Sequence, residues 1–349
     1  MIIENLYLYL TWRCNLHCKH CWVSADAENL LNSCEIPDEK YKDIILEACN
    51  LGVNFIKISG GEPLLRWNAL KIIIQTAVAN GCEILLETNG TLLEQKIVDF
   101  LKAHNCVISI SLDGEQSKHN DLRNSPTAFQ QTDKGLKLLI SNGIIPQIVY
   151  SFSEANDVEI DNMIETLTQT GIKELKLNPI MRVGRGECFQ SKNSLQNVMT
   201  VSADELLRIK NKYCNNPKAD LNVRIMLPVC FDGYSMLFNK DNVFISCPFD
   251  NLISILPNGN VGLCGEAKNI KEFNYGNIYE NSLTTILSSS VNYKAIQKIE
   301  SNLMGVCNSC VAKQLCKGSC RVIAYQYNNS IYSSNPLCEE LHQLGKFPF

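Results

Sequence analysis

Residues Thr11–Trp22 form the stretch T-W-R-C-N-L-H-C-K-H-C-W, which directly follows a short apolar run at the start of the chain. The stretch contains three cysteines in the spacing C-x3-C-x2-C, namely Cys14, Cys18 and Cys21. Three thiolates on one loop can bind three irons of a cubane cluster and leave the fourth iron open, whereas four-thiolate clusters are closed and transfer electrons. The alternative is a zinc site completed by His17 or His20, although structural zinc sites usually pair their cysteines as C-x2-C. The spacing therefore favours an iron–sulfur cluster with one open position.

Expected strands and helices alternate along the first half of the chain. The strands cover residues 2–10, 54–59, 83–88, 107–112, 145–152 and 173–177. The helices cover residues 38–51, 70–80, 94–104, 127–142, 157–170 and 202–213, and several end beside a glycine. This alternation predicts an α/β fold with a parallel sheet and crossover helices. Ligands of such sheets bind outside the carboxyl ends of the strands, and the cysteine loop lies at one such end.

Short polar motifs follow several of these strands. Gly60-Gly61-Glu62-Pro63 comes after the second strand, where the glycines let the backbone approach a ligand and Glu62 can receive an ammonium group. Thr88-Asn89-Gly90, Ser111-Leu112-Asp113-Gly114 and His119-Asn120-Asp121-Leu122-Arg123 come after the third and fourth strands. Each motif alone is also compatible with an ordinary turn or a solvated salt bridge. Together they gather polar groups near the cysteine loop.

The cysteine loop and these motifs together resemble the radical S-adenosylmethionine (radical SAM) enzymes. In that family the open iron chelates SAM, and an electron from the cluster splits SAM into methionine and a 5′-deoxyadenosyl radical. The resemblance implies a partial (β/α)6 barrel core over residues 1–220. It also implies SAM contacts by Trp22, Gly60, Gly61, Glu62, Pro63, Asn89, Ser111, Asp113, Arg123 and Asn156. Residues 182–186, R-V-G-R-G, are either part of the SAM or substrate site or a glycine-rich surface loop.

A second group of cysteines occupies the last third of the chain. It comprises Cys230, Cys247, Cys264, Cys307, Cys310, Cys316, Cys320 and Cys338. Pro257-Asn258-Gly259-Asn260 between two apolar runs predicts a hairpin, at the end of which Cys264 is presented. By count alone these cysteines could form zinc knuckles or two four-iron clusters. Their order, C-x11-G-x4-C, then C-x2-C-x5-C-x3-C, then C, resembles the SPASM domain of radical SAM enzymes, which is implied here over residues 221–349, with a β-hairpin and short helices.

The SPASM resemblance implies two auxiliary [4Fe-4S] clusters, and therefore three clusters in the whole chain. One would use Cys230, Cys247, Cys264 and Cys320, and the other Cys307, Cys310, Cys316 and Cys338. If Cys230 is not a ligand, the first auxiliary cluster has an open iron. Relatives that oxidise sulfatases have an acid directly after the second hairpin-linked cysteine, where this chain has Gly265 and then Glu266. A sulfatase-maturing role is therefore not expected, and Glu266 is the candidate catalytic base.

Composition narrows the range of functions. The 349 residues carry a net charge of −4 with mixed signs, which gives no electrostatic footprint for nucleic acid or an anionic membrane. An odd count of 17 cysteines and no recognisable secretion signal point to metal ligation in the reducing cytoplasm rather than to disulfides.

The resemblance to SPASM proteins makes a ribosomally synthesised peptide the first expected substrate, modified by a cross-link, an epimerisation or another oxidation. The cysteine loop begins about ten residues into the chain, so a leader-binding domain is not expected before it. Either a separate leader-recognition protein as a partner or leader-independent binding would then be required. Flavodoxin or ferredoxin is the expected reductant. Two alternatives stay open: a dehydrogenase or decarboxylase of a small molecule such as a sugar, tetrapyrrole or amino-acid derivative, and a zinc-binding interaction module without catalysis.

Overall fold

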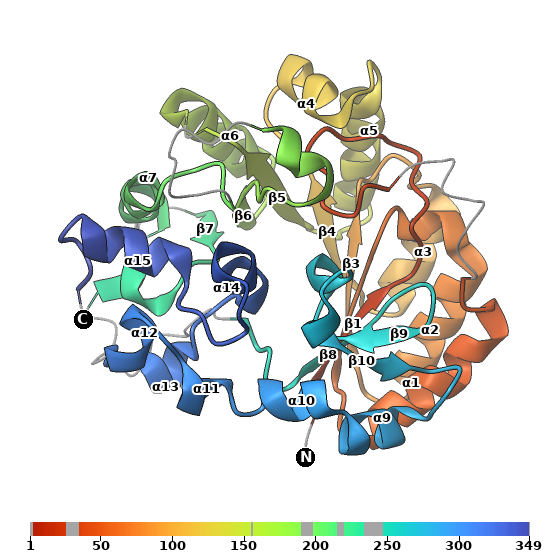
Figure 1. Cartoon of the computed structure of the whole chain (residues 1–349). Helices are drawn as coiled ribbons and strands as arrows, with labels where there is room; N and C mark the ends of the chain where they lie inside the picture. The colour runs from red at the N-terminus through yellow and green to blue at the C-terminus, as the bar shows by residue number, and fades with distance from the viewer. Residues whose placement is uncertain are drawn as a thin grey trace.

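A computed structural model describes residues 3–25, 35–154, 156–189, 198–214, 220–233 and 247–348. These residues form an α/β structure around one ten-stranded sheet, whose strand order is β10-β9-β8-β1-β2-β3-β4-β5-β6-β7 (Figure 1). Because β10 and β7 are the two edges of this order, the sheet does not close into a complete barrel. Within the described ranges, every helix is too short or too polar to cross a bilayer.

Seven parallel strands follow one another in sequence and in space. They are β1 (Asn5–Tyr9), β2 (Phe55–Ser59), β3 (Glu83–Thr88), β4 (Val107–Ser111), β5 (Gln147–Phe152), β6 (Glu174–Pro179) and β7 (Asn222–Ile225). Each pairs in parallel with the next. In β2, β3 and β6 buried residues alternate with half-buried ones, as expected when the two faces of a strand meet different surroundings. The prediction of a parallel sheet is confirmed.

Helices connect these strands and cover the outer face of the sheet (Figure 1). They are α1 (Tyr41–Asn50), α2 (Trp67–Ala79), α3 (Gln95–Ala103), α4 (Gln116–Arg123), α5 (Ala128–Ser141), α6 (Asp157–Gln169) and α7 (Ala203–Ile209). Each predicted crossover helix is present with slightly different ends. The short helix α4 was not predicted, because its sequence is almost entirely polar and shows no apolar period.

The C-terminal third begins by extending the same sheet. The hairpin strands β8 (Leu252–Ile255) and β9 (Asn260–Gly262) confirm the predicted hairpin, and β10 (Asn274–Asn277) pairs with β9. β8 also pairs in parallel with β1, so that Leu6 lies opposite Ile253. Consequently β7 and β8, which both follow residue 220, lie on opposite sides of the strand series β1–β6.

Short helices form the rest of the C-terminal region. They are α9 (Leu283–Ser289), α10 (Val291–Ile296), α11 (Ile299–Asn302), α12 (Val306–Ser309), α13 (Lys313–Cys316), α14 (Arg321–Asn328) and α15 (Pro336–Gln343). α12, α13 and α15 carry three of the predicted ligand cysteines, Cys310 directly follows α12, and α15 also contacts α7 of the first half. Figure 1 shows α11–α15 gathered on the β7 side of the molecule, whereas α9 and α10 lie next to β10.

Candidate functional site

A cavity of about 490 Å³ runs along the inner face of the sheet and reaches the carboxyl ends of its strands. Six of the predicted ligand cysteines line this cavity: Cys14, Cys18 and Cys21 from the loop after β1, and Cys247, Cys264 and Cys320 from the C-terminal third. Two groups of three thiols, more than 220 positions apart in the sequence, therefore face the same cavity.

The thiols of the β1 loop are surrounded by N–H donors. The Cys14 sulfur accepts a hydrogen bond from the backbone N–H of Leu16 at 3.4 Å, and Asn89 Nδ2 lies 3.9 Å from it. Arg123 Nη1 lies 3.7 Å from the sulfur of Cys18. Burial raises the pKa of the Cys14 thiol to about 12, with a further contribution from the Glu62 carboxylate. A bound metal would favour the thiolate despite the raised pKa of the thiol. N–H donors that point at sulfur also suit an iron–sulfur cluster, so these residues fit such a cluster.

The R-V-G-R-G segment supports the backbone of this loop. Arg185 Nε donates to the carbonyl of Cys18 at 2.7 Å, and the backbone N–H of Arg185 donates to the carbonyl of Cys21 at 3.0 Å. Gly184 has a φ of +59°, and a Cβ there would lie 2.4 Å from the carbonyl oxygen of Trp22. The glycine is therefore needed for close contact with the loop, and the arginine fixes the loop conformation.

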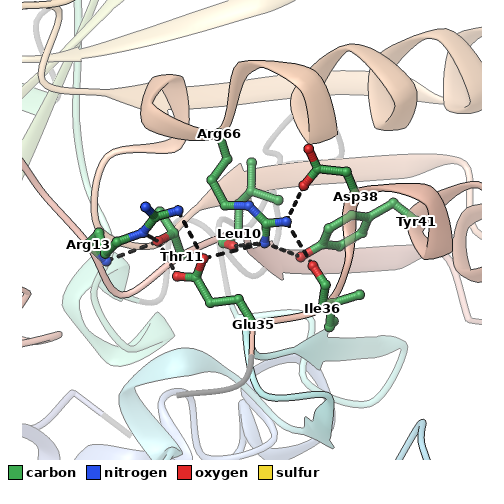
Figure 2. Close-up of polar contacts among 8 residues, drawn as sticks. All are labelled: Leu10, Thr11, Arg13, Glu35, Ile36, Asp38, Tyr41 and Arg66. Atoms are coloured by element: carbon green, nitrogen blue, oxygen red, sulfur yellow. Dashed lines mark hydrogen bonds and ion pairs between the residues drawn. The ribbon is translucent and has the colours of Figure 1, made fainter. Parts of the chain in front are cut away.

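A buried arginine holds the start of the same loop (Figure 2). Arg66, at the end of a short 3-10 helix (Pro63–Arg66), donates to the carbonyls of Leu10 at 3.2 Å and Ile36 at 2.8 Å, and pairs with Asp38. Glu35 pairs with Arg66 at 3.7 Å and with Arg13 at 3.1 Å, and it also accepts a hydrogen bond from Thr11. The end of β1 and the first residues of the loop are thus held to the helical layer.

Six of the ten predicted SAM contacts line the cavity. They are Trp22, Gly60, Gly61, Asn89, Ser111 and Arg123. A Cβ on Gly60 or Gly61 would lie 2.6 Å and 2.0 Å from the backbone oxygens of Thr11 and Arg13, respectively. The two glycines therefore allow the second strand end to lie directly against the cysteine loop.

The other four predicted contacts, Glu62, Pro63, Asp113 and Asn156, are not among the lining residues. Glu62 is fully buried and accepts hydrogen bonds from Leu64 N at 3.1 Å, Thr88 Oγ1 at 2.7 Å and Asn89 N at 2.9 Å. Its carboxylate joins two strand ends, a role that the sequence did not reveal. Pro63 is buried at the start of its 3-10 helix, and exposed Asn156 caps α6.

Asp113 holds Arg123 in place beside Cys18. Its carboxylate accepts a hydrogen bond from Arg123 Nε at 2.6 Å and from the backbone N–H of Ser151 at 2.9 Å. Burial opposes ionisation of Asp113, but the Arg123 guanidinium outweighs it, so the pKa of Asp113 is lowered. The predicted S-x-D-G and H-x-x-x-R motifs therefore meet through this ion pair, while only Ser111 and Arg123 reach the cavity.

The structure regroups the C-terminal cysteines. The sequence placed Cys230 with the cavity-lining group, but its sulfur lies 3.4 Å from the sulfur of Cys338, away from Cys247, Cys264 and Cys320. A contact with Cys338 also lowers the pKa of Cys307 to about 7. The reason is topological: Cys230 follows β7, at the opposite edge of the sheet from the hairpin that presents Cys264. Five thiols, those of Cys230, Cys307, Cys310, Cys316 and Cys338, are therefore absent from the cavity wall.

Gly265 and Glu266 occupy different surroundings. A Cβ on Gly265 would lie 2.4 Å from the Trp22 ring and 2.5 Å from the Tyr9 ring, which leaves no room for a side chain. The Glu266 side chain lines the cavity. Position 265 therefore has no room for an acidic side chain, and the acid at the next position lines the cavity.

Sequence analysis missed a set of polar side chains on the inner face of the sheet. Lys57, Glu87, Ser109, Gln147, Lys176 and Arg224 all line the cavity. The sequence did contain a pattern that indicates them, because charged residues such as Lys57 and Lys176 each lie between two buried aliphatic residues of a strand. In a sheet covered by helices on one face only, such alternation indicates a polar inner face.

Comparisons with known proteins agree with this arrangement. Residues 8–167 match the family model of the Radical SAM superfamily, and residues 247–311 match that of SPASM, an iron-sulfur cluster-binding domain. An AdoMet-dependent heme synthase of Methanosarcina barkeri is 26% identical over 361 residues, covering 97% of this chain and 96% of that protein. The antilisterial bacteriocin subtilosin biosynthesis protein AlbA of Bacillus subtilis is 32% identical, covering 51% of this chain and 39% of that protein.

Solved structures share the fold over almost the whole chain. SuiB of Streptococcus suis bound to S-adenosylmethionine superposes with a TM-score of 0.77 at 18% identity, covering 97% of this chain and 77% of SuiB. Native anSMEcpe with bound AdoMet gives a TM-score of 0.74 at 17% identity, covering 99% of this chain and 96% of that chain. The two family models imply SAM binding and iron–sulfur clusters, in place of a zinc-binding module. The chain therefore belongs to the radical SAM superfamily and carries a C-terminal SPASM domain.

Proposed function

We propose that this protein removes a hydrogen atom from a ribosomally synthesised peptide held in the cavity, and so introduces a cross-link, an epimerisation or another oxidative change. The observation that carries the proposal is that two groups of three thiols face the same cavity. When bound, SAM and iron–sulfur clusters supply a 5′-deoxyadenosyl radical and accept or deliver single electrons. The cavity places a substrate between these two centres and excludes bulk water from it.

In this proposal each group of cysteines has its own task. Cys14, Cys18 and Cys21 hold the cluster that binds SAM, and Gly60, Gly61, Asn89, Ser111 and Arg123 contact SAM. Cys247, Cys264 and Cys320 hold the first auxiliary cluster, which then has an open iron toward the cavity. Cys307, Cys310, Cys316 and Cys338 hold the second, which gives three clusters in all. The first task belongs to a radical SAM core over residues 1–220 and the others to a SPASM region over residues 221–349.

A peptide substrate is supported by three similar proteins. SuiB bound to precursor peptide SuiA superposes with a TM-score of 0.75, and anSMEcpe with bound AdoMet and Cp18Cys peptide with one of 0.73. AlbA is a biosynthesis protein for the bacteriocin subtilosin. The proposed partners are a leader-recognition protein and a flavodoxin or ferredoxin, in the cytoplasm. Glu266 is the proposed base, because its carboxylate faces the cavity next to Cys264.

A small-molecule substrate is the second candidate. The observation that favours it is the coverage of the heme synthase relatives, which align along 96% of the Methanosarcina barkeri protein and 85% of the Oleidesulfovibrio alaskensis protein. AlbA, by contrast, is matched over 39% of its length. The two candidates differ in whether the molecule that enters the cavity is part of a larger chain.

Anaerobic reconstitution followed by a SAM cleavage assay tests the proposal. We expect roughly twelve irons per chain, and deoxyadenosine formation in the presence of SAM and a reductant. Cys14→Ala should abolish deoxyadenosine formation, whereas Cys310→Ala should retain some of it. Incubation with short peptides encoded beside the gene, and separately with tetrapyrroles, should give a mass change in one class. A colourless zinc-containing protein that cleaves no SAM would refute the proposal.

A further inference from the structure

The cavity contains one ammonium group without a protein partner. Lys176, on β6, lines the cavity, and no described residue forms a hydrogen bond or ion pair with its Nζ. The other cations of the wall are paired, since Lys57 binds Glu87 at 3.0 Å and Arg224 binds Glu174 at 3.2 Å. Among these cations of the described wall, Lys176 therefore lacks a counterion in direct contact, while the carboxylates of Glu87 and Glu266 act on it from a longer distance.

Lys176 faces the interior of the cavity. Its neighbours Leu175 and Leu177 are buried on the other face of the strand, so the side chain is directed to the inner face. Burial lowers the pKa of Lys176, and the nearby Lys57 ammonium lowers it further, while the carboxylates of Glu87 and Glu266 raise it. A ligand carboxylate in contact with Nζ would favour the ammonium form more strongly than these two carboxylates, which form no ion pair with it.

A carboxylate of the C-terminal third also lines the cavity. Glu266 comes from the short 3-10 helix Gly265–Ala267 after the hairpin, and no ion pair joins it to Lys176 within the described part of the chain. Its charge raises the pKa of Lys176, as does that of Glu87. Neither carboxylate occupies the position in direct contact with Lys176 Nζ, so a substrate carboxylate can take it.

We propose that Lys176 binds a carboxylate of the substrate and that this contact orients the substrate in the cavity. The proposal rests on the proposed function in assuming that the substrate enters this cavity, and it adds the substrate's chemical class. The carboxylate can belong to an acidic residue of a peptide or to a small carboxylic acid. A charge-assisted hydrogen bond of this kind favours the carboxylate over a neutral amide of the same shape by about tenfold or more.

Binding of matched probes to the reconstituted protein with SAM tests this assignment. N-acetyl-glutamate α-amide carries one carboxylate, and N-acetyl-glutamine α-amide is its neutral isostere. Calorimetry should show about tenfold tighter binding of the carboxylate probe to the parent protein. Lys176→Met should reduce this preference to about one, and Lys176→Arg should keep most of it. Lys134→Met, an exposed and unpaired lysine on α5 in the described structure, is the matched control and should keep the full preference.

Glutarate, which has carboxylates but no amide backbone, separates the two sources of the carboxylate. Tighter binding of glutarate would support a small acid, and tighter binding of the glutamate probe would support a peptide. A parent protein without a preference for the carboxylate probe, or a folded Lys176→Met variant that keeps the preference, would overturn the assignment. Since binding needs no turnover, a parent that prefers the carboxylate but cleaves no SAM would refute the proposed function alone.

Discussion

The sulfur of Cys230 lies 3.4 Å from the sulfur of Cys338, although the two cysteines are 108 residues apart in the sequence. This contact places Cys230 in one group with Cys307, Cys310, Cys316 and Cys338. Three C-terminal thiols remain at the cavity, those of Cys247, Cys264 and Cys320. A three-thiol site keeps a coordination position open, and a group of five thiols has one more than a cluster needs. The two C-terminal groups of thiols are therefore unequal in the structure, whereas the SPASM resemblance implied a four-and-four division.

Removal of single cysteines tests this division. Cys230→Ala should keep nearly the full iron content of the parent, because four other thiols remain in its group. Cys320→Ala should lose roughly four irons per chain, because two thiols do not hold a four-iron cluster. Iron and acid-labile sulfide analysis after anaerobic reconstitution measures both variants. Loss of a whole cluster from Cys230→Ala would contradict the division and restore Cys230 as a required ligand.

The contact of Gly265 with Trp22 and Tyr9 predicts a steric effect. In Gly265→Ala the new Cβ would lie about 2.4–2.5 Å from both rings, so the rings or the hairpin must move. Overpacking of this kind costs about 1–3 kcal/mol. Gly143→Ala is the control, because Gly143 has open space around it and only its φ of +79° opposes a side chain, at about 1 kcal/mol. Thermal unfolding should therefore occur at a lower temperature in Gly265→Ala, and the reverse order would refute this packing.

Local patterns explain why most of the fold was predictable. Strands such as β2 and helices such as α2 show periods of two and 3.6 residues, and each pattern depends only on neighbours in the sequence. The pairing of β8 with β1 joins residues about 247 positions apart, and no local pattern encodes such a partner. β7 was missed for a related reason, since four residues of alternating pattern are too few to be distinguished from a loop.

The residues of the candidate site also fall into two sets: those that a local sequence pattern identifies and those whose surroundings depend on the complete fold. Spacing alone identified Cys14, Cys18 and Cys21, because ligands on one loop are close in sequence as well as in space. The partner of Cys230 depends on which edge of the sheet β7 occupies, and this follows only from the complete topology. Glu62 was predicted as a ligand-binding carboxylate; in the structure it caps the 3-10 helix that follows it, through Leu64 N, and accepts two more hydrogen bonds from Thr88 and Asn89 at the end of β3, which only the folded chain brings next to it.

His119 predicts a specific pH dependence of stability. It is buried, and its Nδ1 accepts a hydrogen bond from the backbone N–H of Asp113 at 3.0 Å. Burial lowers the pKa of His119 to about 4 from the ordinary 6.5. Between these values the unfolded chain binds the proton and the folded chain does not, so the free energy of unfolding falls as pH falls. Between pH 7 and pH 5 this loss amounts to about 2 kcal/mol.

His119→Asn tests the pH effect, because asparagine keeps a hydrogen-bond acceptor but does not titrate. Urea unfolding of the metal-free protein at pH 7 and pH 5 should show a smaller loss of stability in this variant than in the parent. His342→Asn, on the exposed side of α15, is the control and should show the same loss as the parent. An unchanged pH dependence in His119→Asn would exclude His119 as the source.

The brace around Arg66 predicts that the cysteine loop depends on a residue that does not touch it. Arg66→Met would leave Asp38 without this partner and Glu35 with Arg13 alone; because both carboxylates are only partly buried, we expect a cost of about 1–3 kcal/mol. Lys137→Met removes an exposed pair with Asp133 within α5 and should cost at most about 0.5 kcal/mol. Urea unfolding of both variants gives the difference in stability. Because Arg66 also holds the carbonyl of Leu10, iron uptake by the β1 loop should be slower in Arg66→Met, measured by the rise in absorbance during reconstitution. If Arg66→Met unfolded and took up iron like Lys137→Met, the brace would not determine the loop conformation.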